Sequence, residues 1–176
     1  MTTQPQFQFD TTGVFHVMPG HPLHRFMAVN QITWSDLSPF ERGYVEAMLT
    51  GSDGKCLMIQ PARNEWTWAV DLDKARPVAF SDLAPDALAR IMDDCERFCA
   101  NPAIRALLPK GAPENHSCMG RAFWNERTDR AQLQGHSYFA GMAVAEDLTT
   151  LKNAARDRPP LTPYLGDDGK VHLRTS

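Results

Sequence analysis

Two stretches of the chain place apolar residues at helical spacing directly after a helix-start signal. In the first, Ser38 is followed by Pro39 and then by Glu41, so that a hydroxyl and a carboxylate can satisfy the unpaired N–H groups of a helix start. Gly51 supplies a stop, and the apolar positions before it are Phe40, Tyr44, Val45 and Met48. This pattern predicts a helix from Pro39 to about Leu49.

The second helix start repeats the first. The segment Ser81–Pro85 matches Ser35–Pro39 in four of five residues, 46 positions later. Good helix starts resemble one another for capping reasons alone, so we interpret the repeat as convergent. A helix is predicted after it, from Pro85 to about Ala100, because one apolar face recurs through Leu88, Ile91, Cys95 and Phe98.

The rest of the pattern predicts hairpins with two further helices. Helices are expected at Ala103–Leu108 and Glu146–Arg158, and an exposed loop is expected at Lys110–Asn115. Strands are expected at Val14–Met18, Cys56–Ile59, Trp66–Val70, Arg121–Trp124, Leu161–Leu165 and Lys170–Leu173. Helices interleaved with hairpins predict an α+β fold, in which two or three amphipathic helices pack on an antiparallel sheet. We expect a single domain over 13–176, preceded by a flexible tail or edge strand over 1–12.

Composition narrows the classes of function. The 176 residues carry 18 Lys and Arg against 21 Asp and Glu, a formal net charge of -3. This balance excludes a basic nucleic-acid-binding domain, so no direct contact with nucleic acid is expected. The sequence contains neither an apolar run of membrane-spanning length nor the features of a secretion signal at its start. We therefore expect a cytoplasmic protein whose four cysteines are thiols.

A metal site is the first candidate chemistry. Zinc ligands of the right type are offered by Cys95, Cys99, His116 and Cys118, although their spacing is not that of a common zinc module. Burial of Cys95 on the apolar helix face is the favoured alternative. His16, His21 and His24 lack a neighbouring carboxylate and are interpreted as ordinary loop residues. Gly166–Gly169 is interpreted as a hairpin turn, and we expect neither a metal nor another cofactor.

Covalent catalysis is the second candidate. Cys118 could act as a nucleophile with His136 as its base, oriented by Asn115 or Asn125. No local signature accompanies this pair, and the sequence holds no glycine-rich nucleotide-binding or hydrolase motif. The pair nevertheless defines an alternative function, a small hydrolase or transferase.

Aromatic residues are the third candidate. Trp66 and Trp68 share one face of their predicted strand, and Tyr138 and Phe139 lie in a segment between glycines. These four side chains either pack in the core or form an exposed patch that binds a partner protein, because tryptophan and tyrosine dominate binding hot spots.

Several short segments also resemble a known family. They are Ile32–Phe40, Phe80–Pro85, Gly120–Trp124 and Tyr164–Val171. In this order they look like a family of small proteins carried by bacteriophages and other mobile genetic elements, with a Phe-Trp strand, a Gly-His segment and a closing GDDGK hairpin. The chain departs from that pattern in Gly135–Gly141, which keeps Gly-His and an aromatic residue but lacks the family's Trp, Asp and Arg. No catalytic residue is carried over.

This resemblance implies an accessory protein that binds a host protein or nucleoprotein complex. The most specific expectation is an inhibitor of a bacterial defence system, of the anti-CRISPR or anti-restriction type, and a homodimer is compatible with it. A neutral-to-acidic fold suits a basic target surface. The alternatives are the Cys118 enzyme and a virion accessory protein.

Overall fold

The structure is a computed structural model. It describes residues 7–9, 15–17, 32–51, 54–60, 63, 65–68, 74–108, 113–128, 137–143 and 145–175. Near the start of the chain, β1 (Phe7–Phe9) and β2 (Phe15–Val17) pair antiparallel. His16 lies on β2, whereas His21 and His24 fall outside the described residues.

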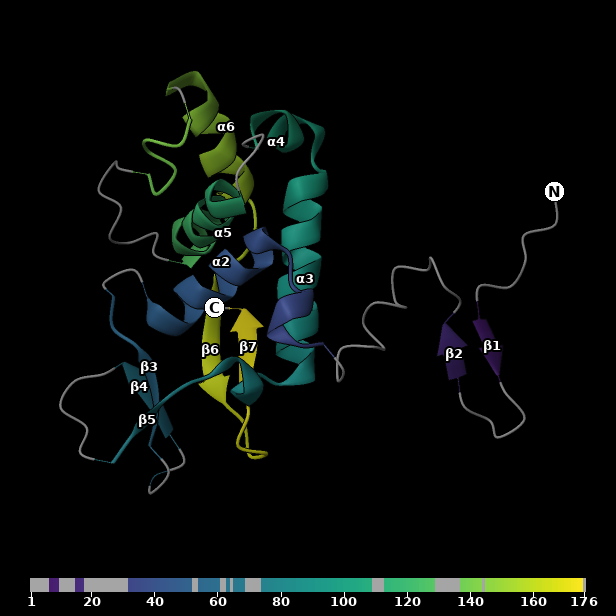
Figure 1. Ribbon diagram of the computed structural model, residues 1–176, viewed down its shortest axis with the longest axis vertical. Helices are drawn as coiled ribbons and strands as arrows, with labels where there is room; N and C mark the ends of the chain where they lie inside the picture. The colour runs from purple at the N-terminus through teal and green to yellow at the C-terminus, as the bar shows by residue number, and fades with distance from the viewer. Residues whose placement is uncertain are drawn as a thin grey trace.

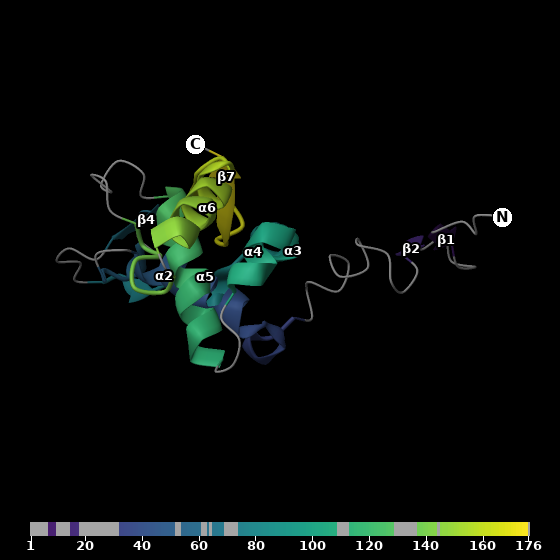
Figure 2. The same cartoon turned by 90° about the horizontal axis from the view of Figure 1, so that it is seen from above.

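Five α-helices dominate the described part of the chain. They are α2 (Pro39–Thr50), α3 (Pro85–Ala100), α4 (Pro102–Leu107), α5 (Pro113–Thr128) and α6 (Ala145–Arg156). The four helices predicted from capping and periodicity are confirmed to within two residues at either end. Figure 1 and Figure 2 show α2 and α5 side by side, with α3 next to them. Within the described residues, none of these helices combines the length and apolar character needed to cross a membrane.

Helix α5 corrects two expectations. Arg121–Trp124 was predicted as a strand but lies within the helix. The second half of the predicted loop at Lys110–Asn115 also belongs to the helix, which begins at Pro113, and the first half lies outside the described residues. A short apolar run fits a buried helix as well as a strand. The spacing of Met119, Ala122 and Phe123, all buried, continues to Glu126 and is helical. The α+β class is confirmed. In the described part of the chain α5 adds a fifth helix to the four predicted by range, where two or three were expected to pack on the sheet.

Helices α2 and α5 pack backbone against backbone. A Cβ atom added to Gly43 would lie 1.9 Å from the carbonyl oxygen of Ser117, and one added to Gly120 would lie 1.9 Å from that of Phe40. No side chain fits at either position, so these two glycines set the distance between the helices.

The strands form two further small antiparallel sheets. In the first, β3 (Leu57–Gln60) lies between β4 (Glu65–Trp68) and β5 (Arg76–Pro77). The second is the hairpin of β6 (Leu161–Leu165) and β7 (Val171–Thr175). Both predicted hairpins are thus confirmed, although Ala69 and Val70 lie outside the described residues.

The repeated segments share one local conformation. Each forms a short 3-10 turn, η2 (Trp34–Asp36) or η3 (Phe80–Asp82), immediately before a helix. Thr33 and Ala79, which precede the turns, have nearly the same φ and ψ angles, -101° and 167° against -104° and 166°. The aromatic rings that begin the two turns meet edge to face, with centroids 5.6 Å apart.

The second helix start is joined to the C-terminal hairpin. The Ala84 N–H donates to the Val171 carbonyl at 2.9 Å, and Lys170 Nζ donates to the Ser81 carbonyl at 2.8 Å. The hairpin therefore lies beside the first turns of α3 (Figure 1).

Aromatic rings from α2, α3 and α5 fill the core. Phe98 stacks on Phe123 with centroids 4.1 Å apart and on Phe139 at 6.3 Å. Tyr44 packs against Phe123 and against Trp124, at 5.4 and 5.1 Å. The core therefore sits where these three helices meet, with the 137–143 segment closing one side.

Candidate functional site

Only one residue of the predicted catalytic pair lies within the described part of the chain. Cys118 lies exposed on α5, and His136 falls outside the described residues, so the pair remains a prediction. Of the two proposed orienting residues, Asn115 is exposed at the start of α5 and Asn125 is buried. Asn125 Oδ1 has no hydrogen-bond partner among the described residues.

The candidate zinc ligands occupy different environments on two helices. Cys95 is buried and Cys99 half-buried on α3, whereas His116 and Cys118 lie half-buried and exposed on α5. Among the described residues, no group of three or more His, Cys, Asp or Glu side chains is arranged to hold a metal ion. Within this part of the chain, the four candidates are thus not brought together as a ligand set.

The two thiols of α3, Cys95 and Cys99, are protonated at neutral pH. Burial raises the pKa of Cys95 well above its usual value, and the nearby Glu41 carboxylate adds to the shift. The same two causes, burial first, raise the pKa of Cys99 to about 11. A protonated thiol is a poor nucleophile and metal ligand, so both side chains act here as small apolar residues.

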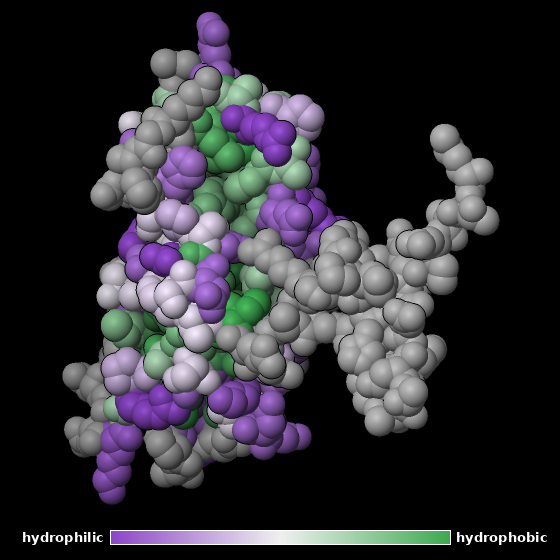
Figure 3. All heavy atoms as spheres, turned by 45° about the vertical axis from the view of Figure 1, so that its right-hand side comes forward, coloured by the Kyte–Doolittle hydropathy of each residue, from purple (hydrophilic) through white to green (hydrophobic). Residues whose placement is uncertain are grey.

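A cavity of about 390 Å³ lies beside these thiols. Its lining comes from α2, α3 and α4 and includes Phe40, the buried Glu41, Cys99, Arg105 and Leu108. On the side of the molecule that carries α3 and α4, apolar areas lie between polar side chains (Figure 3). The cavity thus combines an apolar wall with charges of both signs.

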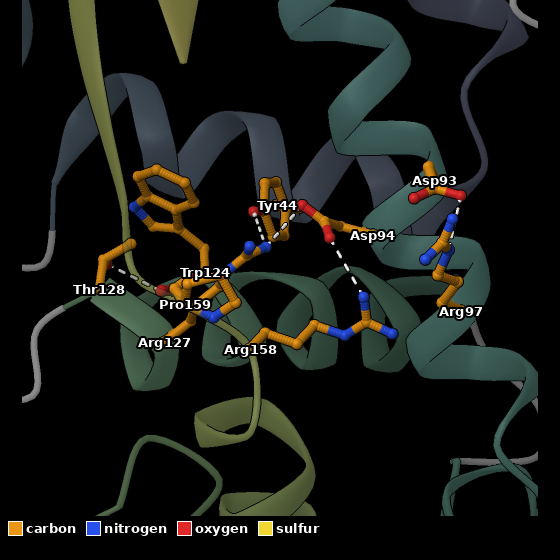
Figure 4. A network of polar contacts seen from close by, with 9 residues as sticks. All are labelled: Tyr44, Asp93, Asp94, Arg97, Trp124, Arg127, Thr128, Arg158 and Pro159. Atoms are coloured by element: carbon orange, nitrogen blue, oxygen red, sulfur yellow. Dashed lines mark hydrogen bonds and ion pairs between the residues drawn. The ribbon is translucent and has the colours of Figure 1, made fainter. Parts of the chain in front are cut away.

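A buried charge network that the sequence analysis missed surrounds Arg127, in the last turn of α5 (Figure 4). Arg127, with 1% of its side chain exposed, donates to Asp94 at 2.7 Å and to the Tyr44 hydroxyl at 3.2 Å through Nη1. Its Nε donates to the Pro159 carbonyl at 2.8 Å, and Arg158 reaches the other oxygen of Asp94 at 3.2 Å. Burial raises the pKa of Tyr44, which therefore stays protonated.

The preceding residue, Glu126, is fully buried and holds the aromatic segment in place. One carboxylate oxygen pairs with Arg156 at 2.8 Å, and the other accepts from the Ser137 hydroxyl at 2.9 Å and from the Tyr138 N–H at 3.0 Å. The signal was present in the sequence, because 126 and 127 continue the spacing of 119, 122 and 123 onto the buried face.

The four aromatic candidates separate into two pairs. Trp66 and Trp68 are half-buried neighbours on β4, with ring centroids 6.4 Å apart, and both pack at the edge of the core. Tyr138 is half-buried. Phe139 is fully buried on Phe98, so it is a core residue and cannot contribute to an exposed patch.

A groove of about 220 Å³ runs between β4 and β6. It is lined by Glu65, Trp66, Tyr164 and Leu165. The Tyr164 ring also stacks on His172 with centroids 5.4 Å apart, and the Arg174 guanidinium lies 5.8 Å from the ring centre. The groove thus brings Trp66 of one hairpin and Tyr164 of the other to one surface. We call this surface, together with Trp68 beside Trp66, the hairpin face.

Comparison of the chain with protein-family models, with curated proteins and with solved structures found no match. Inferences about function therefore rest on the residues and on the geometry described above.

Proposed function

We propose that the protein is an accessory protein of a phage or other mobile element that binds a host protein or nucleoprotein complex. In its most specific form, the proposal is that it inhibits a bacterial defence system of the anti-CRISPR or anti-restriction type. The sequence support is the resemblance carried by Ile32–Phe40, Phe80–Pro85, Gly120–Trp124 and Tyr164–Val171. Of these segments, Gly120–Trp124 lies on α5 and not on the strand that the resemblance implies.

The observation that carries the proposal is the hairpin face. Trp66, Trp68 and Tyr164 each keep part of their surface open to solvent while they are held by the sheet or by a stacked neighbour. Large aromatic side chains that are already fixed lose little conformational entropy on binding and are enriched in hot spots. A partner that covers this face would bury tryptophan and tyrosine together.

Charge supports a basic target. The chain carries a net charge of -3, and Glu65 lies in the groove of the hairpin face. Complementary charge speeds association and selects partners. The surfaces with which defence nucleases bind nucleic acid are rich in Lys and Arg, as phosphate binding requires.

The proposal is tested by phage plating. A strain with an active restriction or CRISPR system that targets the phage is compared with its isogenic strain without that system. Expression of the protein should raise plating on the first strain and leave it unchanged on the second. Purified protein should then form a complex with the defence nuclease or effector that is stable on gel filtration.

A matched pair of variants ties the effect to the hairpin face. Trp66→Ala should weaken the complex about tenfold or more, because a hot-spot tryptophan contributes about 2 kcal/mol or more. Trp34→Ala removes another half-buried tryptophan, which contacts Phe80, and should leave the complex intact. Circular dichroism and thermal unfolding check that both variants fold.

Three outcomes would reject the proposal. Equal plating with and without the protein in every defence strain contradicts inhibition, and copurification with particles instead indicates a virion accessory protein. Loss of the plating effect in a folded Cys118→Ala variant points to the enzyme alternative, since this thiol lies on α5 and not on the hairpin face.

A further inference from the structure

We propose that His172 is a pH-sensitive latch, which holds the turn between β6 and β7 closed while its ring is charged and releases that turn when the ring is neutral. The turn comprises residues 166–170 and joins the two strands of the C-terminal hairpin. The latch is a property of the fold that goes beyond the proposed function and does not depend on it.

Both nitrogens of the His172 ring face a carboxylate. Nδ1 lies 2.9 Å from an oxygen of Asp86 in the first turn of α3, and Nε2 lies 3.1 and 3.2 Å from the two oxygens of Asp168. A charged imidazole can donate to both carboxylates, whereas a neutral one has a single N–H and presents a lone pair from its other nitrogen. The observed pair of contacts is therefore complete only when the ring is charged.

Two cations flank the ring along the chain, and each has a partner of its own. Lys170 Nζ donates to a backbone carbonyl of the second helix start at 2.8 Å, and the Arg174 guanidinium lies 5.8 Å from the centre of the Tyr164 ring. From β6, the group that faces the imidazole is this same phenol ring, with centroids 5.4 Å apart. The carboxylate on α3 and then that of the turn raise the pKa of His172 above the usual 6.5, against partial burial.

Asp168 is the carboxylate that the neutral ring releases. The contact with Asp86 is the shorter one, so the remaining ring proton stays on Nδ1, and the proton that leaves to solvent comes from Nε2. The bond from the Lys170 N–H is the chief cause that lowers the pKa of Asp168, so this carboxylate is charged at neutral pH and repels the exposed lone pair. Its side chain is 53% exposed and can turn into water at little cost.

The turn is built around this contact. Asp168 Oδ1 also accepts from the Lys170 N–H at 3.0 Å, and a Cβ atom added to Gly166 would lie 2.7 Å from that oxygen and from His172 Nε2. When Asp168 turns away, the Lys170 N–H loses its acceptor and the packing against Gly166 is lost. The strands stay paired, because the Gly166 N–H donates to the Lys170 carbonyl at 2.8 Å. Opening is thus confined to the turn.

The test is an NMR titration of the whole ¹⁵N-labelled protein between about pH 5.5 and 8.5, the range in which histidine titrates. The ring signals of His172 report its charge and, once it is neutral, which nitrogen keeps the proton. We expect that proton on Nδ1. The amide signal of Lys170 should shift with the same midpoint as the ring, because its bond to Asp168 is lost, whereas the amide signals of α6 should not move.

Two substitutions in the same turn separate the latch from a general effect of charge. Asp168→Asn can donate to the neutral ring through Nδ2 while Oδ1 still accepts from Lys170, so the Lys170 signal should lose its pH dependence although the ring still titrates. Asp167→Asn removes the neighbouring exposed carboxylate and should leave the Lys170 transition in place. Matching spectra away from the turn show that both variants are folded.

Three results would overturn the latch. A Lys170 signal that stays constant while the ring titrates would show that His172 contributes stability alone. A neutral ring that keeps its proton on Nε2 would assign the release to Asp86, and a Lys170 transition that survives in Asp168→Asn would assign the shift to the charge of the ring itself. None of these measurements involves a host protein, so the latch and the plating result can fail independently.

Discussion

Arg127 is a charged residue that is stable in the core because its hydrogen-bond donors have acceptors there. Removing a guanidinium from water is costly unless its donors are satisfied, and here Asp94, Tyr44 and the Pro159 carbonyl accept from it. Arg158 brings a second guanidinium to the same carboxylate. Asp94 is therefore the residue on which this network depends.

We expect Asp94→Ala to destabilise the protein by about 3–5 kcal/mol, since Arg127 would remain buried without its carboxylate. Asp93→Ala is the matched control. Asp93 pairs with Arg97 at 2.8 Å on the surface, so its loss should cost about 1 kcal/mol or less. Urea unfolding of the three proteins measures both changes, and similar losses in the two variants would contradict the assigned role of Asp94.

Burial of charge was the hardest property to predict from the sequence. The spacing of apolar residues could have placed Glu126 and Arg127 on the buried face of α5, but a charged residue is normally assigned to the surface. What keeps them inside are Asp94, Tyr44 and Arg156, which are distant along the chain. Partners of this kind become known only with the tertiary structure.

At the scale of elements, the contact between α2 and α5 depends on the absence of two side chains. Gly43 and Gly120 each lie against a carbonyl oxygen of the other helix. Replacing glycine by alanine inside a helix ordinarily stabilises it by about 1 kcal/mol. In this pair of helices we expect the same replacement to destabilise the protein.

Gly43→Ala and Gly120→Ala should each destabilise the protein by about 1–3 kcal/mol or more, because the new methyl group meets backbone that cannot move aside cheaply. Thr149→Ala, at an exposed position of α6, is the control and should change stability by less than about 0.5 kcal/mol. Thermal and urea unfolding give the comparison. A stabilised Gly43→Ala variant would show that the helices lie further apart.

The two helix starts offer an internal comparison. Asp36 and Asp82 each accept from the backbone N–H three residues earlier, at 2.8 Å in both cases. Asp82 also binds Arg76 through two bonds of 2.6 and 2.7 Å, which lower the pKa of its carboxyl group. Asp36 instead accepts a second bond from the Thr33 hydroxyl at 2.6 Å. The two aspartates therefore share the bond from the backbone and differ in their side-chain partner.

Asp36→Ala should cost about 1 kcal/mol, as for other capping residues, and Asp82→Ala should cost about 1 kcal/mol more. Unfolding in urea at neutral pH measures the difference. In a chain that already carries Arg76→Ala, Asp82 keeps the bond from the Ala79 N–H but not the ion pair, whereas Asp36 keeps the bonds from both the Thr33 N–H and the Thr33 hydroxyl. Asp82→Ala should there cost no more than Asp36→Ala. A larger loss for Asp82→Ala would assign its extra stability to something other than the ion pair.

Elements with local signals were predicted well, and those without them were not. Ser38, Pro39 and Glu41 determine the start of α2 within four residues of sequence, so the prediction needed no tertiary information. The Phe123–Trp124 pair fits a strand or a helix equally, and contact with α2 decides between them. The groove joins residues 65–66 to 164–165, which no local pattern could have brought together.

At the scale of the whole molecule, His172 joins the C-terminal hairpin to the first turn of α3. Its Nδ1 lies 2.9 Å from Asp86, and its Nε2 lies 3.1 Å from Asp168. The pKa of His172 is raised above the usual 6.5, chiefly by the hydrogen bond to Asp86, with Asp168 adding to it against partial burial. The charged imidazole therefore stabilises the fold.

A raised pKa in the folded state gives stability that is fully present below pH 6.5 and is lost as the pH rises through the folded value. The difference in unfolding free energy between the native protein and His172→Gln should therefore be largest near pH 5 and shrink toward pH 8. Asp86→Asn should lower the His172 pKa measured by NMR. A difference that is constant with pH would contradict the assignment.

The hydrogen bond from Ala84 to Val171 has a consequence for synthesis of the protein. Helix α3 and its apolar face leave the ribosome long before the strand that receives its first turn. Until β7 emerges, the first turn of α3 lacks the strand that it contacts in the folded protein, and the apolar face of the helix is incompletely covered. Binding of chaperones to the nascent chain should therefore fall once β7 has left the ribosome.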